Sequence, residues 1–102
     1  MTYTTIQEII LNIDSINEYS VVFAKRIEGQ FKSYSESIIL ELTEKELELP
    51  IKEIADAKCP GFDYFLEIFL IKEILNDIKD SNQYNDFTKK VERIIRYVEF
   101  DV

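Results

Sequence analysis

The segment from Cys59 to Ile78, CPGFDYFLEIFLIKEILNDI, constrains the fold more than any other part of the chain. Its Pro-Gly pair marks a break, and the apolar run after it predicts a helix from about Gly61 to Lys79. On a helical wheel one face carries Tyr64, Ile68, Ile71, Ile74, Leu75 and Ile78, and the opposite face carries Phe62, Phe65, Leu66 and Phe69. The first half of this helix therefore needs cover on two sides, from the same domain or from a partner.

The length and residue content predict one small domain without a cofactor. A chain of 102 residues with 46% hydrophobic residues can close one core, so we expect a single domain over residues 1–102. No long uncharged apolar stretch or signal-like start is visible, which favours a cytoplasmic protein that does not interact with membranes. The chain has no histidine, two glycines and one cysteine, Cys59. Histidine-based catalysis, His-metal clusters and glycine-rich phosphate loops are therefore excluded, and we expect neither an enzyme nor a metal or cofactor site.

Apolar periodicity predicts an α+β fold in which helix dominates. We expect a small antiparallel β-hairpin or sheet packed against three to four helices. The expected strands run from Tyr19 to Ile27 and from about Phe31 to Leu42, with a turn at Gly29. The expected helices, besides the apolar one, are Thr5–Ile16 with Thr5 and Glu8 at capping-box spacing, a short helix from Pro50 to about Ala57, and Asp86 to Phe100, paired antiparallel with the apolar helix.

Acidic residues are concentrated between Glu41 and Asp56. Like charges at Glu44, Glu46 and Glu48 would share one side of an extended chain and form an acidic ridge. The net charge of the chain is −8, from 20 acidic and 12 basic residues. Such a field repels nucleic acids and anionic membranes and attracts a basic protein. An ordinary solvated surface is the alternative interpretation of this ridge.

Three stretches carry a resemblance to a protein group. They are AKR at residues 24–26, GFDYFLEIFLIKEIL at residues 61–75 and VERIIRYVEFDV at residues 91–102. Together they resemble small bacterial domain proteins of cyanobacterial type, a group without an assigned activity. By type alone, the chain is also similar to the acidic immunity proteins and antitoxins that block a toxin's active surface. These resemblances imply a fold and a class of partner, and no site residue follows from them.

Three functional hypotheses remain from the sequence. The first is a non-enzymatic acidic protein-binding module of the inhibitor or immunity type, in which Glu44, Glu46 and Glu48 steer a basic partner and exposed aromatics anchor it. The second is a homo-oligomeric structural or regulatory protein, such as a homodimer, with Phe62, Phe65 and Phe69 as the interface. An enzyme would need Asp63 and Glu67, one helical turn apart, to work as a pair, and acidic residues at this spacing are more often plain surface.

Overall fold

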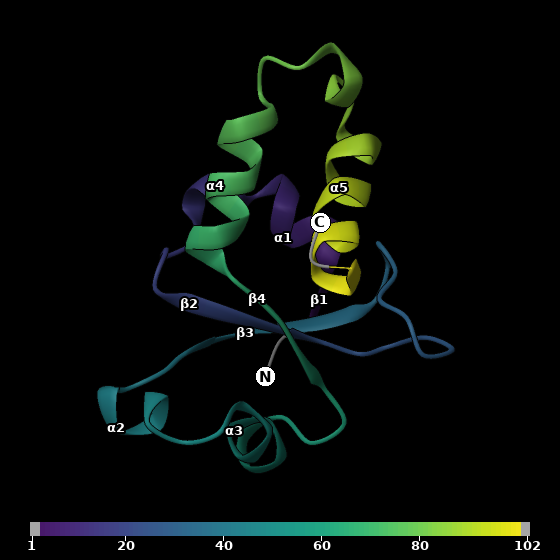
Figure 1. Cartoon of the computed structure of the whole chain (residues 1–102). Helices are drawn as coiled ribbons and strands as arrows, with labels where there is room; N and C mark the ends of the chain where they lie inside the picture. The colour runs from purple at the N-terminus through teal and green to yellow at the C-terminus, as the bar shows by residue number, and fades with distance from the viewer. Residues whose placement is uncertain (1–2, 101–102) are drawn as a thin grey trace.

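A computed structural model describes residues 3–100 and shows helices on both sides of a β-sheet (Figure 1). One face of the sheet is covered by α1 (Ile6–Leu11), α4 (Ile68–Ile78) and α5 (Phe87–Phe100). The other face carries α2 (Glu44–Leu47) and α3 (Ile51–Lys58). Short 3₁₀ helices follow α1 at Ile13–Ser15 and precede α5 at Asn82–Tyr84. The chain is therefore a three-layer α+β domain with the sheet in the middle.

The sheet has four antiparallel strands in the order β1-β3-β2-β4. The strands are β1 (Thr4–Thr5), β2 (Ser20–Ala24), β3 (Glu36–Glu41) and β4 (Asp63–Glu67). All five residues of β2 are buried, because this central strand is covered by helices on both faces. The expected pairing of the two middle strands is confirmed, with Val22 opposite Ile39. The turn at Glu28 and Gly29 has positive φ at both residues, as a tight two-residue hairpin turn requires.

The expected packing of a β-hairpin or small sheet against three to four helices was wrong, whereas the α+β class and the larger share of helix are confirmed. The structure has a four-stranded sheet and, within residues 3–100, five α-helices. The main error lies at Asp63–Glu67, where the predicted start of the apolar helix is strand β4. A short segment that is apolar on all sides suits a strand with helices above and below it as well as a buried helix. The helix itself begins at Ile68, directly after the strand.

A β-bulge in β4 places two neighbouring large side chains on the same side of the sheet. Val22 pairs with Leu66 and Phe23 pairs with Tyr64, so Phe65 is the extra residue. Phe65 and Leu66 both enter the core beneath α1, α4 and α5, where the Phe65 ring meets Phe31 edge to face, with 5.0 Å between ring centroids. The bulge therefore strengthens the larger of two separate cores.

The two faces of the sheet carry cores of unequal size. The core on the face of α1, α4 and α5 contains the buried residues Ile6, Ile9, Ile10, Ile13, Val22, Ala24, Phe31, Phe65, Leu66, Ile68, Ile71, Val91 and Ile94. The core on the face of α3 contains the buried residues Val21, Phe23, Ile38, Ile54, Ala55, Cys59 and Phe62. The first face is closed by three helices, whereas α3 supplies most of the helical cover of the second.

The remaining helix predictions are confirmed in place and differ in length. The first helix ends at Leu11, five residues earlier than expected, and the Thr5 hydroxyl caps it by accepting a hydrogen bond from the Glu8 amide at 3.3 Å. The Glu8 carboxylate accepts from the Thr4 hydroxyl at 2.9 Å, so a reciprocal capping box is not formed. The helices α4 and α5 run antiparallel (Figure 1). None of the helices within residues 3–100 has the length and apolarity needed to span a membrane.

Candidate functional site

The three glutamates of the expected acidic ridge lie at a helix and not along an extended chain. Glu44 and Glu46 lie in α2, and Glu48 follows its last turn. The Thr43 hydroxyl accepts from the Glu46 amide, and the Glu46 carboxylate accepts from the Thr43 amide, which makes a complete capping box. The ridge geometry was therefore wrong, because a local capping motif favoured a helical turn over the extended form. Whether these glutamates bind a partner stays a prediction.

Glu46 is engaged within the chain and is not a free charge. Its carboxylate forms an ion pair with Lys58 at the end of α3. This pair, together with the hydrogen bond from the Thr43 amide, lowers the pKa of the Glu46 carboxyl below its usual value. Glu44 and Glu48 are exposed, and no ion pair is seen for them in the described residues. They are the two members of the ridge that are available to a partner.

Large apolar side chains lie in water beside these two glutamates. Leu47, Leu49 and Ile51 are 61%, 49% and 40% exposed. We call the set Glu44, Leu47, Glu48, Leu49, Ile51 and Glu53 the α2–α3 surface. Leu47 and Leu49 were not predicted as part of a site. No pattern in the sequence indicated their exposure, because it depends on which residues α3 buries.

The three phenylalanines of the expected interface do not share a face. Phe65 is buried in the larger core, Phe62 is buried in the smaller core on the other side of the sheet, and Phe69 is 43% exposed on α4. Phe62 stacks against Tyr3 with 5.5 Å between ring centroids. Phe65 lies in β4 and Phe62 directly precedes this strand, whereas Phe69 lies in α4, so the helical wheel did not apply to the first two. The homo-oligomer hypothesis loses the interface on which it was based.

Asp63 and Glu67 lie at opposite ends of β4 and do not form a catalytic pair. Asp63 forms an ion pair with the Arg26 guanidinium at 3.5 Å. Glu67 accepts a hydrogen bond from the Tyr64 hydroxyl. Burial first, and then this hydrogen bond, raise the pKa of the Tyr64 phenol well above its usual value, so the phenol remains protonated. Both carboxylates therefore have structural partners.

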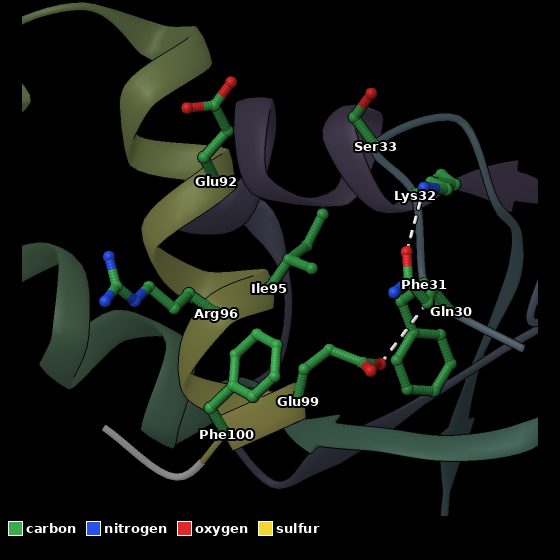
Figure 2. A pocket seen from close by; sticks show the side chains of 9 residues that line it. All are labelled: Gln30, Phe31, Lys32, Ser33, Glu92, Ile95, Arg96, Glu99 and Phe100. Carbon is green, nitrogen blue, oxygen red and sulfur yellow. Dashed lines mark hydrogen bonds between the residues drawn. The ribbon is translucent and has the colours of Figure 1, made fainter.

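An open groove of about 780 Å³ separates α5 from the segment after the hairpin turn (Figure 2). Its apolar lining includes Phe31 and Ile95, and its charged lining includes Lys32, Glu92, Arg96 and Glu99. The Glu99 carboxylate accepts from the Phe31 amide at 3.4 Å and from Arg26 at 2.9 Å. The Arg26 guanidinium also lies 4.2 Å from the centre of the Phe31 ring. These contacts attach the hairpin to α5, so Arg26 and Glu99 serve the fold.

A second open groove, of about 610 Å³, lies between α1, the following 3₁₀ helix, α4 and the start of α5. Three lysines, Lys72, Lys79 and Lys90, line it together with a single acidic residue, Asp14. The rest of the lining is Ile10, Leu11, Ile13, Leu75, Asn76 and Phe87. The charge of this groove is thus opposite to that of the chain.

No cluster of metal-ligating side chains occurs within residues 3–100. The Cys59 thiol is buried at the end of α3, and burial raises its pKa, which disfavours the reactive thiolate. Cys59 therefore acts as a core side chain.

Comparisons with protein families, curated proteins and solved structures gave no significant match to this chain.

Proposed function

We propose that this chain is a non-enzymatic acidic protein-binding module of the inhibitor or immunity type, and that it docks a basic protein on the α2–α3 surface. The observation that carries the proposal is the exposure of Leu47, Leu49 and Ile51 within an acidic segment. Exposed apolar side chains ringed by charge are typical of protein interfaces.

The two kinds of residue in the surface have different roles in binding. Between Glu41 and Lys58 the chain carries six acidic residues and three lysines, and one of those lysines is paired with Glu46. The excess acidic charge speeds the encounter with a basic surface and sets orientation. Burial of a leucine or isoleucine side chain contributes roughly 1.5–3 kcal/mol, so the apolar residues supply most of the affinity.

The attachment of the segment to the domain suits a docking role. The helix α3 is anchored by Ile54, Ala55 and Cys59 in the smaller core, whereas no residue of α2 is buried. The Thr43 capping box fixes the first turn of α2, and the pair between Glu46 and Lys58 joins α2 to α3. The binding residues are therefore held in a defined shape before a partner arrives, which lowers the entropy lost on binding.

Affinity capture with matched variants tests this function. The wild-type chain is immobilised beside a variant with Leu47→Ser, Leu49→Ser and Ile51→Ser, and both are exposed to a lysate of the source organism. A control variant carries Tyr19→Ser and Tyr34→Ser, two exposed side chains outside the α2–α3 surface. Circular dichroism first establishes that all three chains are folded.

The proposal predicts a basic protein that binds the wild-type chain and the control variant, and that the triple variant loses. Added salt should slow its association. Equal capture by all three chains, or capture of acidic proteins alone, would contradict the proposal. Loss of binding in the control variant alone would place the site elsewhere on the molecule.

A further inference from the structure

The groove lined by Lys72, Lys79 and Lys90 differs from the rest of the molecule in charge. The chain has 20 acidic and 12 basic residues, yet this groove has three lysines and one aspartate. It lies on the helical layer formed by α1, α4 and α5, on the side of the sheet opposite α2 and α3 (Figure 1). A positive groove on an acidic domain concentrates anionic groups locally, because apolar walls focus the field of the lysines.

The groove is also apolar at its base and at its rim. Ile10 and Ile13 are buried below it, and Leu75 is partly buried beside them. Leu11 and Phe87 stand exposed at its edges, on α1 and at the start of α5. At one end of the groove, the Lys72 ammonium is held in place because it donates a hydrogen bond to the Ile16 carbonyl at 3.0 Å. A fixed cation and exposed apolar edges form an amphipathic surface before any ligand is bound.

We propose that this groove binds an acidic amphipathic helix of a second protein. Such a helix would lay its apolar face between Leu11 and Phe87 and direct its carboxylates to the three lysines. A small anionic amphiphile is the weaker occupant, because it would fill the base of an open groove and leave Leu11 and Phe87 in water. The site is separate from the α2–α3 surface and takes a partner of the opposite charge, so the domain can hold two proteins at once.

Binding of designed peptides tests the proposal. The probe is a fluorescein-labelled helical peptide of about 18 residues, with leucine on one face and glutamate on the other, and a reference peptide has lysine in place of each glutamate. The acidic peptide should bind and shift the amide resonances of Leu11, Leu75 and Phe87 in NMR spectra. The reference peptide should not shift them.

Charge reversal within the groove supplies the matched comparison. Lys79→Glu with Lys90→Glu should weaken acidic-peptide binding by about tenfold or more at low salt, since like charges replace opposite ones. Lys45→Glu with Lys52→Glu makes the same change in charge on α2 and α3 and should leave the affinity within about twofold. Lys72 is kept because its hydrogen bond to Ile16 supports the fold.

Four outcomes would overturn the proposal. The first is equal binding of both peptides, and the second is an equal loss of affinity in the two charge-reversed variants. The third is movement of the groove resonances with protein concentration alone, which would make a second copy of this chain the occupant. If dodecanoate shifts the same resonances and the acidic peptide does not, the groove is a small-molecule site and the proposal is wrong.

Discussion

The two faces of the sheet are covered in different ways. Three helices close one face over a core that includes Phe65, Ile71 and Ile94, and few of their inward side chains remain in water. On the other face α3 buries Ile54 and Ala55, and α2 buries no residue. The layer of α1, α4 and α5, which we call the thick layer, supplies most of the apolar burial and hence most of the stability. The layer of α2 and α3, which we call the thin layer, keeps apolar side chains exposed in an acidic setting, as a binding surface requires.

The two faces also differ in charge. The segment from Ile68 to Phe100 contains six acidic and six basic residues. The segment from Glu41 to Lys58 has twice as many acidic as basic residues. A basic partner is therefore attracted to the thin layer more than to the thick one. Most of the stability therefore comes from one face of the sheet, and the proposed site for a basic partner lies on the other.

The largest effect is expected at the β4 bulge. Phe65→Ala removes a ring that is 1% exposed and packs against Phe31, and it should lower the free energy of unfolding by about 3–5 kcal/mol. Phe69→Ala, four residues later and partly in water, should cost less than about 1.5 kcal/mol. Urea unfolding of both variants measures the difference. Equal losses of unfolding free energy would mean that Phe65 and Phe69 lie in similar environments, as the helical wheel had placed them.

Two matched core substitutions, with an effect of intermediate size, compare the stability of the two layers directly. Ile94→Ala in α5 and Ile54→Ala in α3 make the same change at 0% and 2% exposure. We expect about 4 kcal/mol for Ile94 and about 2 kcal/mol for Ile54, because the thin layer can relax into the space that is left. Urea unfolding gives both values. A larger cost at Ile54 would mean that the thin layer is the more tightly packed one.

The smallest effect concerns the ion pair that fixes α2 to α3. The pKa of Glu46 is lowered below 4.5, so its contribution to stability is complete above that value and is lost as the pH falls through the folded pKa. NMR titration of the Glu46 carboxyl should show the lowered pKa. Lys58→Met should return it toward 4.5, and Lys52→Met should leave it unchanged. An unchanged titration in Lys58→Met would remove the pair as the cause.

The sequence predicted the elements whose apolar residues follow a single period, either that of a strand or that of a helix. A strand was predicted from Tyr19 to Ile27 and the last helix from Asp86 to Phe100, and both are confirmed, at Ser20–Ala24 and Phe87–Phe100. Local signals also located the Thr5 cap and the turn at Gly29. In these places the buried face and the local backbone preference agree, so one sequence pattern suffices.

The sequence was misread where a strand runs directly into a helix. Between Phe62 and Phe69 a single apolar run covers β4 and the first turn of α4, and the helical period fitted all of it. The choice depended on the pairing of β4 with β2, a contact between residues about 40 positions apart that no local pattern records. The same limit applies to the candidate site, because the exposure of Leu47 and Leu49 depends on which residues α3 buries.

Hydrogen exchange on the chain with and without its captured basic partner tests the assignment of recognition to the thin layer most directly. We predict that the partner slows exchange of backbone amides between residues 44 and 58 and leaves the amides of α4 and α5 unchanged. Protection in α4 and α5 with no change between residues 44 and 58 would contradict the assignment and place the basic partner on the other face of the sheet.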